Sequence, residues 1–102
     1  MARDIGTLLD RALKAAASRS GCSLDIAAST WRRWASATFV GARHSVVVRA
    51  SASAAFDAWL GALCEAEFSI AGHLVADLRL VAVERSPEVV EAVLEILTVA
   101  VD

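Results

Sequence analysis

The sequence predicts an α+β fold, a two-layer sandwich in which two helices cover one face of a four-stranded, mainly antiparallel sheet. Two segments repeat apolar residues at three- and four-residue spacing, as amphipathic helices do. Four other segments alternate apolar and polar residues with a period of two, as half-buried strands do. The order of these segments is α-β-β-α-β-β. At 102 residues, the chain has the length of one domain, residues 1–102.

The first half of the chain predicts one helix and two strands. The helix covers residues 4–18, and the first strand covers residues 22–30. A longer strand covers residues 38–50, and Gly41 inside it predicts a bulge or a close approach of another backbone. A hairpin turn at residues 41–44 is the alternative. We favour one bulged strand, because Gly-Ala-Arg-His does not match the preferred two-residue hairpin turns.

The second half predicts a helix over residues 53–67 and a strand over residues 73–84. Residues 89–101 are ambiguous, because their apolar positions fit both periods. Seven of these thirteen residues are β-branched, which favours a strand. A helix would also place Glu91 and Glu95 one turn apart, a repulsion that no lysine offsets. We therefore predict a strand.

The two halves repeat the same order of elements. Residues 4–50 and residues 53–101 each read helix, strand, strand, at a spacing near 48 residues. Their residue identity is poor, so the repetition suggests an internal αββ duplication on the order of elements alone.

The predicted sheet has an uncovered face. On the strand at residues 73–84, the alternation predicts a helix-facing set: Leu74, Ala76, Leu78, Leu80 and Ala82. On the opposite, open face, apolar side chains stand between charged ones, and we predict that they form an oligomer interface: Val75, Val81, Val83, Leu97 and Val99.

Composition also favours self-association. The apolar fraction of 57% is high for a chain this short, which predicts an apolar patch buried against a partner chain. Residues 1–50 carry a net charge of +5, and residues 51–102 carry −7. Opposite charges on the two halves attract within or between subunits, so we expect a homodimer or a larger homo-oligomer. The acidic half would repel phosphate, which makes nucleic acid an unlikely partner.

Location, membrane and cofactor signals are absent from the sequence. There is no signal-peptide pattern, and no apolar run approaches the roughly 18–20 residues that span a bilayer. Cys22 and Cys64 belong to no metal or redox motif and are expected to be small, buried apolar side chains. These features predict a cytoplasmic protein without a membrane, metal or cofactor partner.

The run Trp31-Arg32-Arg33-Trp34 has two interpretations. Aromatic rings beside arginines can stack on bases and bind phosphates, which would indicate single-stranded nucleic acid. The more common alternative is that the rings close the end of the core or an interface, with the arginine stems lying over them. We favour the second interpretation, and we keep Trp31 and Trp34 as candidate ligand-binding residues.

His44 and His73 are the candidate catalytic residues. Each follows a glycine near the start of an apolar strand segment, so a pseudo-symmetric fold would bring the two imidazoles near each other. Hydrogen bonding of strand-end histidines to loop carbonyls is the more common outcome. Arg43 is a candidate ligand-binding residue beside His44. The leading hypothesis is a homo-oligomeric interaction or small-ligand-binding domain, and the alternative is a small enzyme with an inter-subunit site using Arg43, His44 and His73.

Overall fold

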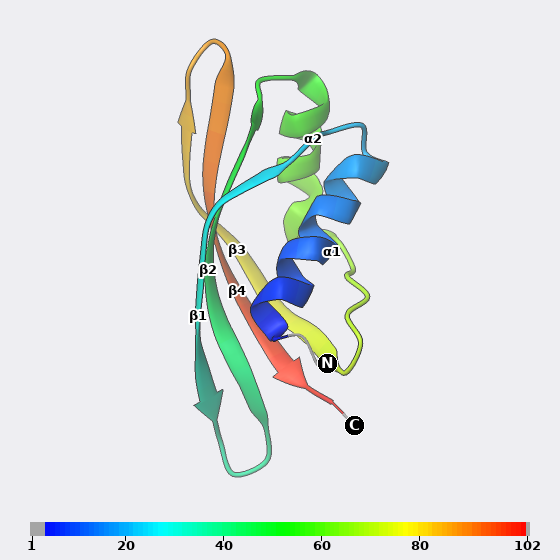
Figure 1. Cartoon of the computed structure of the whole chain (residues 1–102), viewed down its shortest axis with the longest axis vertical. Helices are drawn as coiled ribbons and strands as arrows, with labels where there is room; N and C mark the ends of the chain where they lie inside the picture. The colour runs from blue at the N-terminus through cyan, green and yellow to red at the C-terminus, as the bar shows by residue number, and fades with distance from the viewer. Residues whose placement is uncertain (1–3, 102) are drawn as a thin grey trace.

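The structure, a computed structural model, describes residues 4–101 and confirms the predicted α+β fold. Its elements are α1 (Ile5–Arg19), β1 (Asp25–Ala35), β2 (Val40–Ser51), α2 (Ala54–Ala62) with a 3₁₀ turn (Leu63–Glu65), β3 (His73–Arg85) and β4 (Val89–Ala100). Figure 1 shows two layers, with both helices on one side of a twisted sheet. Within the described residues, no helix has the length and apolar character needed to cross a membrane.

The sheet joins two hairpins through its central strands. The strand order is β1-β2-β4-β3, and every neighbouring pair is antiparallel. The β2–β4 register runs from Gly41 opposite Val99 to Ser51 opposite Val89. Val46 pairs with Leu94, which lies 48 positions later in the chain. The two α-β-β units therefore pair through their last strands, β2 and β4, which run antiparallel and are matched at their midpoints.

Both helices begin at side-chain caps. The Asp4 carboxylate accepts a hydrogen bond from the Thr7 amide at 2.8 Å, and the Ser53 hydroxyl accepts one from the Phe56 amide at 3.0 Å. Each cap satisfies an amide that the first helical turn leaves without a partner. The helices then bury one apolar stripe each against the sheet, and the fully buried side chains include Leu9, Leu13, Phe56, Leu63, Val46 and Leu94.

Two expectations about the central strands are settled by the structure. Residues 89–100 form β4, so the strand prediction is confirmed and the helix alternative is wrong. Residues 40–51 form one strand, with no turn at residues 41–44. The pairing of β2 with both neighbours passes Gly41 without a register shift, so the predicted bulge is absent. The close backbone approach is present, because a Cβ on Gly41 would lie 2.0 Å from the Thr98 carbonyl oxygen.

The first strand lies further along the chain than the sequence predicts. Cys22 and Leu24 are buried but precede β1, which continues through Trp31 to Ala35. The reason is the hairpin: residues 36–39 form the turn, so β1 pairs with β2 over the whole run up to Ala35 opposite Val40.

The predicted faces of β3 are wrong at both ends of the strand. Register shifts leave Ala76 and Val81 as extra residues, and each shift reverses the alternation. Val75 and Val83 therefore face the helices and pack on the core, instead of lying on the open face. Two residues that were predicted to face the helices lie on the open face instead: Leu74 pairs with Val99, and Ala82 pairs with Val93. Ala76 lies exposed at the first shift, so the predicted helix-facing set keeps only Leu78 and Leu80.

Replacement of Gly41 by alanine should destabilise the fold by on the order of 2–4 kcal/mol, because the new methyl group would collide with the β4 backbone. Gly61, on α2, is a matched control, since a Cβ there meets nothing within 4 Å. Gly61→Ala should raise stability by about 0.5–1 kcal/mol, because alanine suits a helix interior better than glycine. Urea denaturation of both variants tests the contrast, and equal effects would refute it.

Candidate functional site on the open sheet face

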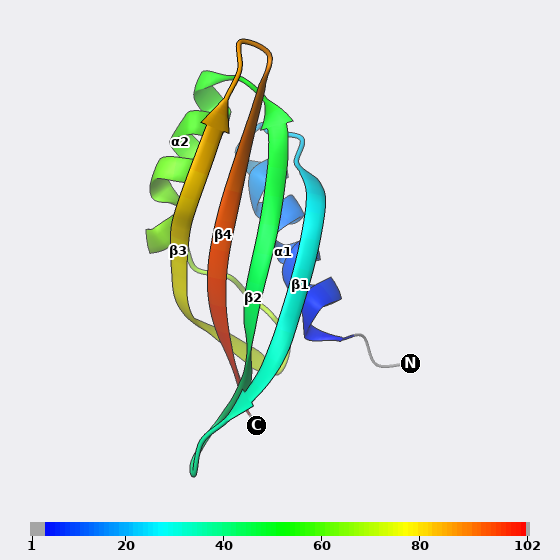
Figure 2. The same cartoon turned by 90° about the vertical axis from the view of Figure 1, so that its left-hand side faces the viewer.

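The sheet face opposite the helices is uncovered by any other part of residues 4–101. Figure 2 looks onto this open face, with all four strands in front and the helices behind. The strand register arranges its side chains in rows that cross the sheet in the order β1, β2, β4, β3. Row one is Trp34, Gly41, Val99 and Leu74, and row two is Arg32, Arg43, Leu97 and Asp77. Row three is Thr30, Ser45, Glu95 and Arg79, and row four is Ala28, Val47, Val93 and Ala82. Row five is Asp25, Arg49, Glu91 and Glu84.

The rows alternate in character. Rows one and four are apolar across the whole width of the sheet. Rows three and five are polar or charged throughout, and row two is charged except for Leu97. Leu97 and Val99 lie on this face and are half-buried, whereas Leu74 is 58% exposed and Val81, at the second shift of β3, is 51% exposed. The open face therefore exposes apolar side chains in bands separated by charge.

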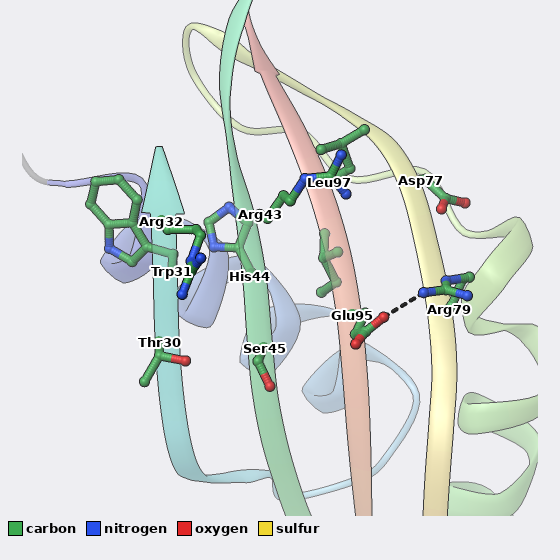
Figure 3. Close-up of a pocket in the computed structure, with 11 residues that line it drawn as sticks. Thr30, Trp31, Arg32, Arg43, His44, Ser45, Asp77, Arg79, Glu95 and Leu97 are labelled. Carbon is green, nitrogen blue, oxygen red and sulfur yellow. Dashed lines mark hydrogen bonds and ion pairs between the residues drawn. The ribbon is translucent and has the colours of Figure 1, made fainter. Parts of the chain in front are cut away.

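Rows two and three line a pocket of about 490 Å³, together with Trp31, His44 and Ile96 from the same stretches of their strands (Figure 3). The pocket is charged, with three arginines (Arg32, Arg43 and Arg79) against two acids (Asp77 and Glu95). Arg79 forms a salt bridge with Glu95, drawn as the dashed line in Figure 3. Among residues 4–101, no salt bridge is found for Arg32, Arg43 or Asp77.

Two of the pocket arginines lie close enough for their positive charges to repel each other. Arg32 on β1 and Arg43 on β2 are directly opposite each other in the register. Like charges at opposite positions of an antiparallel pair repel. In Figure 3, the two side chains diverge, with Arg43 extending across β4 beside Leu97 and Arg32 turning back toward Thr30. The fold alone does not compensate this pair of cations.

Charge is also divided between the two sides of the open face. The β1–β2 side carries Arg32, Arg43 and Arg49 against Asp25. The β4–β3 side carries four acids, Asp77, Glu84, Glu91 and Glu95, against Arg79. Arg49 and Glu91 meet at 2.7 Å across the middle of the sheet. The uneven charge of the two halves of the sequence thus appears on this face as a basic side and an acidic side.

The predicted tryptophan–arginine cluster is split between the two faces of β1. Trp34 and Arg32 lie on the open face, whereas Trp31 and Arg33 lie on the helix side. The Trp31 ring supports the first turn of α1, because a Cβ on Gly6 would lie 2.7 Å from it. The Trp34 indole nitrogen would lie 2.8 Å from a Cβ on Gly41. The two rings therefore do not form one stacking platform for nucleic acid bases.

His44 is a buried histidine on the helix side of β2, only 3% exposed. Its Nε2 lies 2.9 Å from the Thr98 hydroxyl, which donates to the Ala42 carbonyl at 3.5 Å. The other ring nitrogen of His44, Nδ1, is buried and has no hydrogen-bond partner among the described residues. Burial, and secondarily the nearby His73, lower the pKa of His44 to about 4.

His44 and His73 both lie on the helix side of the sheet, whereas Arg43 lies on the other face. His73 pairs with Ala100 at the start of β3, on the helix side, and its Nδ1 is also buried without a partner. Arg43 is exposed on the opposite face. Among residues 4–101, no group of three or more potential ligand side chains is placed to hold a metal ion. The three predicted residues thus do not form one cluster within a subunit.

Comparison with protein-family models, with curated proteins and with solved structures gives no match. Sequence reasoning missed Val93 and Arg32 as members of this face. The alternation from Glu91 to Glu95 places Val93 there once residues 89–100 are read as a strand, whereas the facing of Arg32 depends on the strand extending past residue 30.

Protonation of His44 should make stability depend on pH. Its pKa is lower in the folded chain than the ordinary 6.5, so the unfolded chain binds more protons between pH 6.5 and about 4. The contribution of His44 to the free energy of unfolding is therefore fully present above pH 6.5. It falls as the pH drops, by up to about 1.4 kcal/mol per pH unit. Denaturation curves of the wild type and His44→Gln across this window should differ in slope. His73→Gln should keep most of the slope, since burial is the main cause, and identical slopes in the wild type and His44→Gln would contradict this account.

Proposed function

We propose that the protein is a homodimeric interaction domain, in which the open faces of two copies stack into a two-sheet interface. The alternation of apolar rows with charged rows on an otherwise uncovered face supports this proposal above any other observation. Apolar rows one and four would lose their contact with water, and stacked sheets pack about 10 Å apart. The role of the domain would be to associate, with the pocket of rows two and three enclosed at the seam.

The size of the open face is suited to a stable dimer. Four strands at about 4.8 Å spacing are about 19 Å wide, and eleven paired positions at about 3.3 Å are about 36 Å long. These dimensions give roughly 700 Å² per subunit, close to the roughly 800 Å² of a standard protein interface. A second copy of the chain is thus a large enough partner to cover the face.

Charge selects the orientation of the second copy. A two-fold axis parallel to the strands, between β2 and β4, places each row over the same row of the partner. Within each row, the partner's strands then lie in reverse order, so that β1 faces β3 and β2 faces β4. The basic side then faces the acidic side, and row four stacks Val47 on the partner's Val93. An axis perpendicular to the strands would instead place apolar row one on charged row five. The parallel axis is therefore the favoured arrangement.

The alternative of a small enzyme has less support. Arg43 and His44 belong to opposite faces of β2, and His44 is buried under the helices. A dimer through the open face would add partner residues to Arg43 but none to His44.

Replacement of Val47 by aspartate should convert the dimer to monomers. Two carboxylates would then be buried per dimer at about 2 kcal/mol each, which weakens association roughly a thousandfold. Ala55→Asp is the matched control, because it adds the same charge to an exposed position in the first turn of α2. Sedimentation equilibrium should give a dimer for the wild type and Ala55→Asp and a monomer for Val47→Asp. A wild type that sediments as the 10.7 kDa monomer would refute the proposal.

Exchange of Arg32 and Asp77 tests the orientation. In the proposed dimer, each faces the other across the seam, although they lie on opposite edge strands of one sheet. Arg32→Asp and Asp77→Arg should each weaken the dimer at least about tenfold, because like charges would then face each other. The double variant should regain most of the lost affinity. Additive losses in the double variant would rule out this pairing and leave the dimer itself in place.

A further inference from the structure

We propose that the dimer seam holds a small oxyanion, a phosphate or carboxylate group, between the Arg43 side chains of the two subunits. This inference rests on the proposed dimer and on its parallel axis. It gives the self-association surface a ligand of defined chemistry.

Arg43 would lie beside the two-fold axis of the dimer. Arg43 lies on β2, one of the two central strands, in row two. The parallel axis passes between β2 and β4, so the Arg43 side chains of both copies approach it from opposite sheets. Each guanidinium would face a partner Leu97, which supplies no counter-charge.

The pocket would carry excess positive charge when the dimer closes over it. Rows two and three contribute three arginines and two acids from each chain. Glu95 is engaged by Arg79 within the chain, and Asp77 would face the partner's Arg32. One guanidinium per chain, Arg43, is then left without an acid, and two such cations are enclosed per dimer. Enclosed unpaired charge is costly, so an anion of about two negative charges would stabilise the seam.

The side chains of the pocket suit an oxyanion. Guanidinium groups bind phosphate and carboxylate oxygens through paired hydrogen bonds. The row-three hydroxyls of Thr30 and Ser45 also line the pocket and can donate hydrogen bonds to the same oxygens. A pocket of about 490 Å³ per chain fits a small metabolite that carries such a group better than it fits a polymer.

The experiment measures dimer dissociation with and without inorganic phosphate or malonate, against chloride at equal ionic strength. One oxyanion per two chains should tighten the dimer about a hundredfold when the free anion is a hundred times its dissociation constant. The phosphate and malonate arms show which oxyanion the site prefers. Arg43→Gln should abolish this response while keeping a dimer. Arg33→Gln, which removes a charge from the helix side of β1, should respond as the wild type does.

Each other outcome has a distinct meaning. A dimer that neither oxyanion tightens more than chloride does would overturn the anion site and leave the dimer proposal standing. One anion per chain, lost equally in Arg32→Gln and Arg43→Gln, would overturn the shared site at the axis. A protein that stays monomeric under all conditions would overturn the dimer proposal itself.

Discussion

The pairing of β2 with β4 is the interaction on which the rest of the structure depends. It joins the two α-β-β halves over eleven residue pairs, and it is the only strand pairing between the two halves within residues 4–101. Its register decides which side chains the helices bury and which remain on the open face. Gly41 is needed at one end of this pairing, because the β4 backbone occupies the space that a side chain would fill.

The two faces of the sheet differ in burial and in charge. The helix side buries a continuous apolar core together with the polar pair His44 and Thr98, and burial favours the neutral form of His44. The open face has apolar rows that water solvates poorly and arginines that outnumber acids in its pocket. A second copy in the parallel orientation would cover the apolar rows, and an oxyanion would compensate the excess charge. One arrangement thus accounts for both features of the open face.

Much of this architecture could be predicted from the sequence, because long alternating segments carry a clear signal. The choice of a strand for residues 89–101 depended on β-branched residues and on the repulsion of Glu91 and Glu95, and the structure confirms it. The facing of β3 could not be predicted. Extra residues at Ala76 and Val81 reverse the alternation, and nothing in their side chains distinguishes them from regular strand residues.

The candidate site was harder to predict than the fold, because it depends on which strands are neighbours. The sequence identified Arg43, Leu97 and Val99, but the row that unites Arg43 with Asp77 exists only in the order β1-β2-β4-β3. Likewise, His44 and Arg43 are adjacent in the chain and belong to opposite faces of the sheet. Adjacency in sequence along a strand separates side chains, whereas hydrogen-bonded register brings them together.

The most direct test of the central claim is isotope-filtered NOE spectroscopy on an equal mixture of labelled and unlabelled chains. It reports methyl contacts between subunits without altering the protein. The proposed dimer predicts intermolecular contacts between Val47 and Val93, across stacked open faces. Intermolecular contacts confined to the helix side of the molecule, or none at all, would contradict the account.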